Sequence, residues 1–306
     1  TLSERIISAF YKPRFNPPQL ITFDEVNPTM DSGYYTFVVV IPSGFEKKIL
    51  KQEATEIQLN IDATRMTQAG VGSGYIQAII NQEIANSLNQ KEISPINLVT
   101  TFKYNPNLIS TWFGGINEII SNIMMLSILL SGAALMRERE HGTIEHLLVM
   151  PLNAAQIMLS KIWSMGLVIL IGVTFSLLFV VEMVLQIPLQ GSMLLFLFAT
   201  LLVLLSTTSM GIFMATLAQS MPQLGMLFIL IILPLLMLSG GISPYESMPE
   251  VIQYIMYLSP TSHYMEVAQA ILFRGADITI IWGNLLAIFI IGIAFFVGAL
   301  TLFKRS

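Results

Sequence analysis

Three ionisable residues in the middle of the chain recur at the spacing of one helical face and could suggest a metal site. They are Glu138, His141 and Glu145. The string is not the H-E-x-x-H of zinc peptidases, however, and Gly142 interrupts any continuous helix that would align these side chains. We therefore expect no metal to be bound by the chain.

The chain lacks the sequence motifs that nucleophilic catalysis and nucleotide binding require. Ser239 or Ser243 with His263 could suggest a serine protease within a membrane, yet no G-x-S-x-G motif supports a nucleophile. The chain has no cysteine, so thiolate chemistry is excluded. It also has no G-x-x-x-x-G-K-[ST] loop to hold nucleotide phosphates. We expect no catalytic residue and no cofactor bound by this chain.

The segment from Met136 to Pro151, MREREHGTIEHLLVMP, is the only dense group of charges in the C-terminal two thirds of the chain. Charges in hydrocarbon are costly, so this segment must lie in water. After Gly142, Thr143 can cap a helix, and Glu145 lies in its first turn, where the helix dipole favours an anion. The apolar residues that follow fall on one face: Ile144, Leu147 and Leu148. The sequence predicts a short amphipathic helix displayed at a membrane surface.

Composition divides the chain into two parts. Hydrophobic residues make up 54% of the chain and charged residues 11%, and the mean hydropathy of +0.70 is typical of a membrane protein. Residues 1–113 hold nine Lys and Arg with ten Asp and Glu, whereas residues 114–306 hold only six and nine. We predict a soluble domain over residues 1–113 and a membrane α-helical bundle over residues 114–306. The net charge of −4 and the lack of a basic face argue against nucleic acid as a partner.

Five stretches approach the roughly 20 apolar residues that a bilayer core requires. They are Ile116 to Met136, Ile162 to Leu185, Met193 to Ala218, Gln223 to Ser239 and Ile278 to Phe303. The fourth is the shortest and contains Pro234, so we expect it to be kinked. In the third, the small residues Thr207, Gly211 and Ala215 predict close packing against another helix of the same subunit.

Basic residues predict the orientation of these spans. All but one of those after Gly114 fall on one side of the topology: Arg137, Arg139, Lys161, Lys304 and Arg305. The positive-inside rule makes that side the cytoplasm and places residues 1–113 outside it. Five spans that end inside predict a sixth helix before Thr1, with a cleaved signal peptide as the alternative.

Residues 1–113 have the pattern of an α+β domain. Strands are predicted over Tyr35 to Ile41, Glu56 to Ile61 and Ile96 to Tyr104. A helix is predicted over Tyr75 to Leu88, and the Thr1-Leu2-Ser3-Glu4 string is a capping box for another. Nothing in this part has the spacing of a metal or nucleophile site, so we expect a folded lid or docking module.

The block Glu138 to Leu148, followed by Pro151 and Lys161, resembles the cytoplasmic coupling segment of ABC-2 type ABC-transporter permeases. The resemblance continues through Met237 to Gly241, Met248-Pro249, Ser259-Pro260-Thr261 and Ala268 to Gly275. The large domain ahead of the spans is similar to that of the multidrug-export branch. The resemblance implies a coupling segment over residues 137–161 and an extracytoplasmic re-entrant hairpin over residues 240–277. It also implies contacts to an ATPase from Glu138, Glu140, Gly142, Thr143, Glu145, Leu147 and Leu148.

The same resemblance implies partners, location and function. ATP and Mg²⁺ would be bound by a separate ABC ATPase subunit, and a second permease subunit, identical or different, would complete the pathway. A periplasmic adaptor would be a further partner. The implied function is export of a hydrophobic or drug-like substrate across the bacterial inner membrane, by a multi-pass subunit that exposes its cavity to each side in turn.

Three carboxylates at membrane depth are candidates for the substrate pathway, because ionisable residues there are costly to keep. Glu118 and Glu182 lie near the outer ends of two spans and Glu266 lies in the hairpin, where each could attract a cation or relay protons. Simple contact with interfacial water is an equal alternative for Glu118 and Glu182.

Two other functions remain open at this stage. One is a membrane-anchored sensor or assembly factor, in which the outer domain binds a ligand and the charged segment signals. The other is a channel, which is disfavoured because no span presents a repeated polar face. Association with an ATPase in a nucleotide-dependent manner would separate the permease from the sensor.

The predicted orientation can be tested by cysteine labelling because the chain has no native cysteine. Ser87→Cys should react with a membrane-impermeant maleimide in intact spheroplasts, whereas Asn153→Cys should react only after permeabilisation. Equal labelling of both sites in intact spheroplasts would overturn the orientation.

Overall fold

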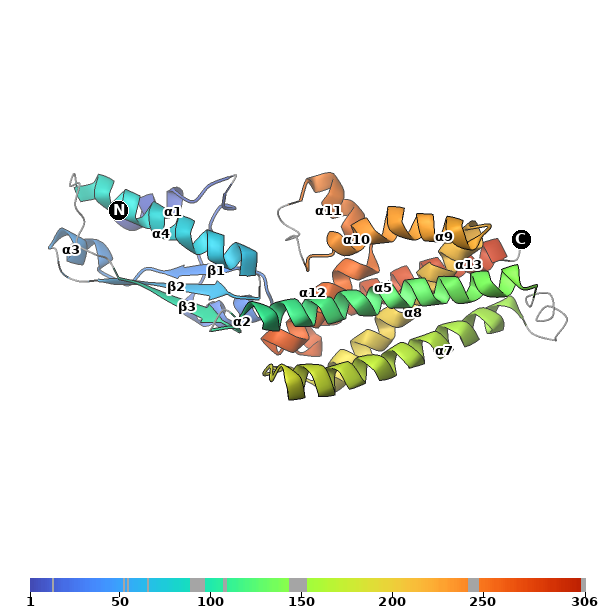
Figure 1. The fold of residues 1–306 in the computed structure, drawn as a ribbon. Helices are drawn as coiled ribbons and strands as arrows, with labels where there is room; N and C mark the ends of the chain where they lie inside the picture. The colour runs from blue at the N-terminus through green and yellow to red at the C-terminus, as the bar shows by residue number, and fades with distance from the viewer. Residues whose placement is uncertain are drawn as a thin grey trace. The chain divides into compact units, whose positions relative to one another are not determined.

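The structure is a computed structural model that describes residues 1–303 apart from 13, 52, 54, 65, 89–96, 107–108, 143–152 and 242–247. The chain divides into two compact units, Thr1–Ser110 and Thr111–Ser306. Figure 1 shows the sheet in the first unit and the long helices in the second.

The first unit holds a three-stranded sheet in the order β1, β2, β3. Strand β1 (Phe37–Val40) pairs antiparallel with β2 (Glu56–Asp62), which pairs parallel with β3 (Asn97–Lys103). The parallel pair needs a crossover, and helix α4 (Met66–Leu88) lies between the two strands in the sequence. The shorter helices are α1 (Leu2–Ser8), η1 (Phe23–Glu25), α2 (Val26–Asp31) and α3 (Phe45–Leu50).

Every second residue of β2 is apolar, and these side chains form the core of this unit. Ile57, Leu59 and Ile61 have no exposed surface and pack in one cluster with apolar residues of α4, which are Ile76, Ile80 and Ile84. Burying each such side chain stabilises the fold by about 1.5–3 kcal/mol. The three predicted strands and the capping box of Thr1 and Glu4 are confirmed, and α4 begins nine residues earlier than the predicted Tyr75.

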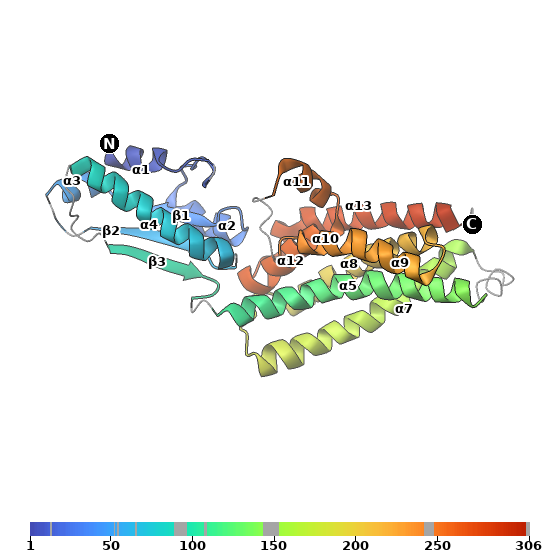
Figure 2. The same cartoon turned by 45° about the horizontal axis from the view of Figure 1, so that its top comes forward.

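Four helices of the second unit are long and apolar enough to cross a membrane, counted over the residues that the structure describes. They are α5 (Ser110–Glu140), α7 (Ala154–Phe175) with its π-helical continuation η2 (Ser176–Val184), α8 (Met193–Leu217) and α13 (Ile278–Phe303). Figure 2 shows these helices side by side. The second unit is therefore a membrane helical bundle.

The fourth predicted span, Gln223 to Ser239, begins and ends two residues earlier than predicted, at Met221 and Met237. It forms α9 (Met221–Leu227), a π-helical stretch η3 (Phe228–Ile232) and α10 (Leu233–Met237), which together make an apolar helix shorter than the four above. Pro234 lies in the first turn of α10, directly after the π-helical stretch. π-helical turns are wider than α-helical ones, and the kink expected at Pro234 stays a prediction.

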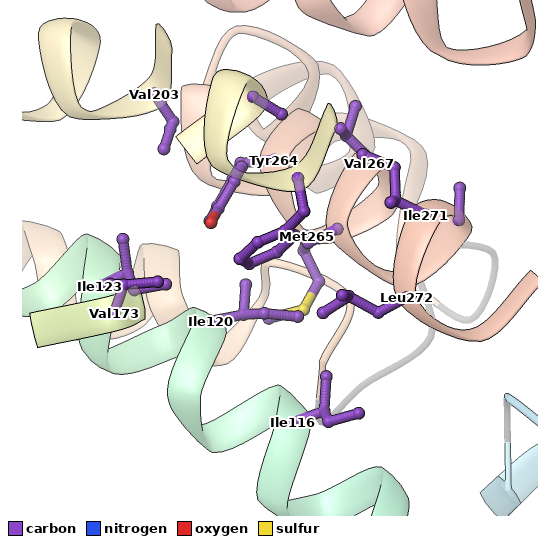
Figure 3. Close-up of a cluster of buried hydrophobic side chains, with 14 of the residues drawn as sticks. Ile116, Ile120, Ile123, Val173, Val203, Tyr264, Met265, Val267, Ile271 and Leu272 are labelled. Carbon is purple, nitrogen blue, oxygen red and sulfur yellow. The ribbon is translucent and has the colours of Figure 1, made fainter. Parts of the chain in front are cut away.

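Two further helices, α11 (Glu250–Tyr257) and α12 (Pro260–Arg274), lie before α13 in the sequence. Helix α12 is buried along nearly its whole length, and Tyr264 at its centre donates or accepts a 2.8 Å hydrogen bond with Thr200 of α8. Figure 3 shows Met265 of α12 beside Ile120 of α5, and Tyr264 and Ile116 belong to the same core cluster.

Helix α8 is the central element of the bundle. In its spanning stretch 56% of residues are buried, against 22% in α7 and in α13. Its small residues meet α5: Thr207 accepts a 2.6 Å hydrogen bond from Ser127, and Gly211 lies against Ser131 and the carbonyl of Ile128. The close helix packing predicted from Thr207 and Gly211 is confirmed.

Substitution of Gly211 tests how tightly α5 and α8 are packed. A Cβ at Gly211 would lie 2.2 Å from Ser131 Oγ and 2.3 Å from the backbone oxygen of Ile128, so the helices would have to separate. We expect Gly211→Ala to destabilise the detergent-purified protein by about 1–3 kcal/mol in thermal unfolding. The matched control is Gly283→Ala in α13, where a Cβ meets no atom within 4 Å and should stabilise slightly. Equal melting temperatures for the two variants would contradict the close approach.

Candidate functional site

The charged segment begins inside helix α5 rather than after it. From the sequence, the first span is predicted to end at Met136, so that Glu138 and the residues after it lie outside every span. In the structure, α5 continues through Glu140. Arg and Glu are good helix formers, and Arg137 and Arg139 in the last turn complement the negative end of the helix dipole. The separation predicted from the sequence is therefore wrong for Glu138 and Glu140, whose positions are fixed by the end of a long helix.

Gly142 ends this helix. Its backbone has φ +69°, in the left-handed region that glycine adopts without strain, and its N–H donates a 3.2 Å hydrogen bond to the carbonyl of Arg139. The prediction that Gly142 breaks the helix is confirmed. The other proposed contact residues, Thr143, Glu145, Leu147 and Leu148, lie outside the described residues.

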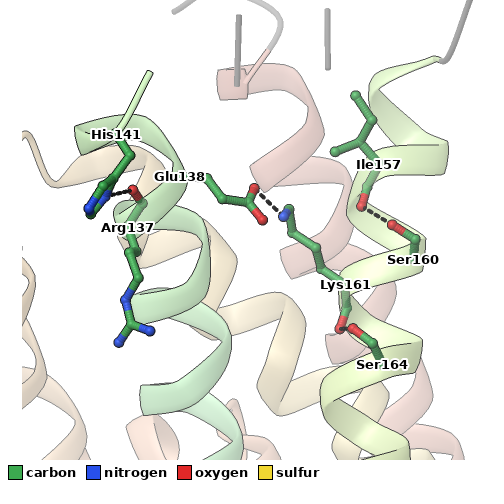
Figure 4. A network of polar contacts seen from close by, with 7 residues as sticks. All are labelled: Arg137, Glu138, His141, Ile157, Ser160, Lys161 and Ser164. Atoms are coloured by element: carbon green, nitrogen blue, oxygen red, sulfur yellow. Dashed lines mark hydrogen bonds and ion pairs between the residues drawn. The ribbon is translucent and has the colours of Figure 1, made fainter. Parts of the chain in front are cut away.

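Glu138 pairs with Lys161 across the segment that joins α5 to α7. Figure 4 shows its Oε2 facing the Lys161 Nζ, and the two form an ion pair with a hydrogen bond. The Lys161 side chain is 11% exposed and that of Glu138 32%. An ammonium so largely removed from water needs an anionic partner, and Glu138 is that partner. Asn153 and Gln156 begin α7 with a capping box, in which the Gln156 side chain accepts a 2.9 Å hydrogen bond from the backbone N–H of Asn153.

Arg139 reaches the C-terminal end of α8. Its Nη1 donates hydrogen bonds of 3.1 Å to the carbonyl of Ala215 and 3.3 Å to that of Ala218. Carbonyls at a helix C-terminus lack partners within the helix, and a cation there also complements the dipole. Arg139 therefore caps α8 from the neighbouring helix.

Glu140 reaches the N-terminal residue of α9. Its Oε1 accepts a 2.7 Å hydrogen bond from the backbone N–H of Met221, the first residue of that helix. We name Glu138, Arg139 and Glu140 the coupling junction. Its three consecutive side chains bind α7, the end of α8 and the start of α9, and so connect the last turn of α5 to three other helices.

The three candidate pathway carboxylates are exposed and lie on different elements. Glu118 is on α5, where it accepts a 3.1 Å hydrogen bond from Asn122; Glu182 is on η2 and Glu266 on α12. No ion pair or hydrogen bond joins any two of them. No group of three or more potential metal-ligating side chains occurs in the part of the chain that the structure describes.

His263 is held in place by its neighbours. One ring nitrogen lies 3.0 Å from Oδ1 of Asn284 and the other 2.8 Å from the carbonyl of Tyr257. Ser239 donates to the carbonyl of Leu236, and Ser243 lies outside the described residues. His263 thus joins α12 to Asn284 of α13 and to the carbonyl of Tyr257 in α11 through hydrogen bonds of its ring.

Sequence reasoning missed the partners of the coupling junction. Glu138 and Glu140 were expected to face another protein. Their partners within the chain were missed because the sequence pattern does not show which side chains and backbone N–H groups lie near them in space. A signal was present for one pair: Lys161 is a lone cation in an apolar helix and lies close in sequence to the acidic segment.

Comparisons with known proteins place this architecture among transporters. Residues 8–301 match the family model described as "ABC-2 family transporter protein". The chain is 51% identical over 308 positions to the "Inner membrane transport permease YhhJ" of Escherichia coli K12, covering 100% of this chain and 82% of that protein. It is 29% identical to the "Probable multidrug ABC transporter permease YbhR" of the same strain, covering 92% and 77%, and 26% identical to YbhS, covering 91% and 73%.

A double-mutant cycle tests the pair of Glu138 and Lys161. Glu138→Gln leaves a largely buried ammonium without its anion, so we expect it to destabilise the protein by about 1–3 kcal/mol, a range reduced for the partial exposure of Glu138. Lys161→Met should cost less, and the double variant should regain part of the stability that Glu138→Gln loses. Thermal unfolding in detergent provides the measurement, with Glu118→Gln as the control at an exposed carboxylate. Strictly additive effects would refute the pairing.

Proposed function

We propose, from the premise that this chain belongs to the ABC-2 family of transporter proteins, that it is the permease subunit of an ATP-driven exporter. The chain is a multi-pass membrane protein and no motif in it holds nucleotide phosphates. ATP and Mg²⁺ are then bound by a separate ABC ATPase. The location is the inner membrane, as in the name of the relative that is 51% identical.

The observation that carries this proposal is the coupling junction. A transporter that takes its energy from another subunit needs a rigid connection between the surface where that subunit acts and the helices that form the pathway. Glu138, Arg139 and Glu140 supply it, because one turn of α5 is bonded to α7, α8 and α9. The ATPase contacts residues 143–148, and the junction carries the displacement into the bundle.

The remaining features of the proposal follow if the coupling junction faces the cytoplasm, where the ATPase binds. The junction lies at the cytoplasmic end of the bundle, the apolar helix Met221–Met237 is the fifth span, and residues 1–113 are extracytoplasmic. Residues 240–277 form the re-entrant hairpin on the outer side. A second permease subunit, identical or different, faces this one, and a periplasmic adaptor continues the path.

Glu118 supports a pathway along the exposed face of α5. It lies within the predicted span with Asn122 as its partner, and both side chains would be costly against lipid. We therefore place this face at the contact with the second subunit, where a polar cavity is available. The cargo is hydrophobic or drug-like, as the names of the multidrug relatives suggest, and Glu118, Glu182 and Glu266 favour a cationic one.

Substitutions in the coupling segment test the function. Gly142→Pro forces φ to about −65°, against the observed +69°, and should abolish ATP-dependent export while the protein still inserts in the membrane. Gly142→Asn is the matched control, because Asn tolerates the left-handed region and should retain most export. Reversal of charge by Glu140→Lys with Glu145→Lys should weaken retention of the ATPase.

The measurements are ethidium accumulation in inverted membrane vesicles and pull-down of the ATPase by the tagged chain. Wild-type export and wild-type ATPase retention in both Gly142→Pro and the double reversal would show that the segment is an ordinary solvated loop. Failure of the wild-type chain to retain any ATPase would favour the sensor instead.

A further inference from the structure

A buried chain of amide hydrogen bonds joins three elements at the opposite end of α5 from the coupling junction. Gln269 of α12 donates from Nε2 to Oδ1 of Asn117 on α5, over 3.0 Å. Asn117 in turn donates from Nδ2 to the carbonyl of Gly241, over 3.3 Å. Gly241 follows α10 by four residues, so the chain of bonds ties α12, α5 and the turn after α10 together.

The surroundings of this amide pair are apolar. Asn117 and Gln269 are each 8% exposed, and their neighbours on the same helices, Ile120 and Met265, have almost no exposed surface. Figure 3 shows these two neighbours beside each other in the core cluster. Side chains of Leu in both positions would fill such a site but would leave the Gly241 carbonyl without the donor that Asn117 supplies. The amide pair therefore fixes the position of the turn at Gly241 in addition to joining α5 to α12.

The turn at Gly241 is also fitted against α12. A Cβ at this position would lie 2.7 Å from Met265 Cε, and the preceding Gly240 has φ +101°. The turn is thus held from two sides, by packing against Met265 and by the hydrogen bond from Asn117. Both contacts depend on the relative position of α5 and α12.

We infer that Asn117 and Gln269 form a latch at the outer end of the bundle, which holds the turn at Gly241 against α12 and releases it when α5 is displaced from its cytoplasmic end. This inference rests on the proposed function, because the displacement comes from the coupling junction. Amide hydrogen bonds suit this role, since they are directional and contribute little net energy between membrane helices. Asn117 and Gln269 are positioning residues for transport and do not bind the substrate.

Removing the latch should uncouple transport from ATP hydrolysis. Asn117→Leu and Gln269→Leu should each lower ATP-dependent ethidium accumulation in inverted vesicles by roughly tenfold, with ATP hydrolysis and ATPase retention unchanged. The swapped variant Asn117→Gln with Gln269→Asn keeps two amides and the same number of methylene groups, so it should restore accumulation. Thr200→Val is the matched control, because it removes another buried hydrogen bond between α8 and α12 and should leave coupling intact.

A reversible cross-link tests whether the latch opens. Asn117→Cys with Gln269→Cys lacks both amides and should already accumulate less ethidium than the wild type. A short bifunctional methanethiosulfonate should join its two thiols and abolish the remaining accumulation while the ATPase stays bound, and a reductant should restore the level of the untreated variant. Undiminished accumulation in the cross-linked protein would overturn the latch, and so would wild-type accumulation in both leucine variants. A wild-type chain that neither retains an ATPase nor accumulates ethidium would refute the proposed function itself, and the latch with it.

Discussion

The close approach of α5 to α8 is the constraint on which the rest of the bundle depends. Gly132 and Gly211 allow the two backbones to meet, and Ser127 bonds Thr207 beside them. Hydrogen bonds of this kind contribute only about 0.6 kcal/mol on average between membrane helices, whereas an unpaired polar group there costs several times more. The polar contacts therefore specify which faces meet, and packing of the small residues supplies the attraction.

Once α5 and α8 are fixed together, the charged turn at Glu138 to Glu140 acquires its partners. Arg139 meets the carbonyls at the end of α8 only because α5 runs beside α8 to that point. Glu140 then reaches the first N–H of α9, which follows the same turn. The charges of Arg139 and Glu140, which would be unfavourable in lipid, are thus paired with the backbone carbonyls and N–H group at the ends of α8 and α9. The junction thus combines two requirements, solvation of charge and rigid connection of helices.

Much of this fold could be predicted from the sequence because its signals are local. Hydrophobic length located the four long helices, and α13 has the predicted bounds Ile278–Phe303. Alternation located the strands. The contacts of Arg139, and the bond between Gln269 and Asn117, could not be predicted, because they join residues far apart in the chain and depend on how helices cross. The π-helical stretch before Pro234 also escaped prediction, since its sequence is as apolar as that of an ordinary helix.

In the proposed mechanism, α5 carries a displacement from its end at Glu140 to residues 240–277 without changing its contact with α8. Double electron–electron resonance tests it with two pairs of spin labels in the complex with the ATPase. We expect ATP with vanadate to leave the distance between His141→Cys and Leu217→Cys unchanged and to shift the distance between Thr111→Cys and Tyr254→Cys. Unchanged distances in both pairs, or a larger shift in the first pair than in the second, would contradict it.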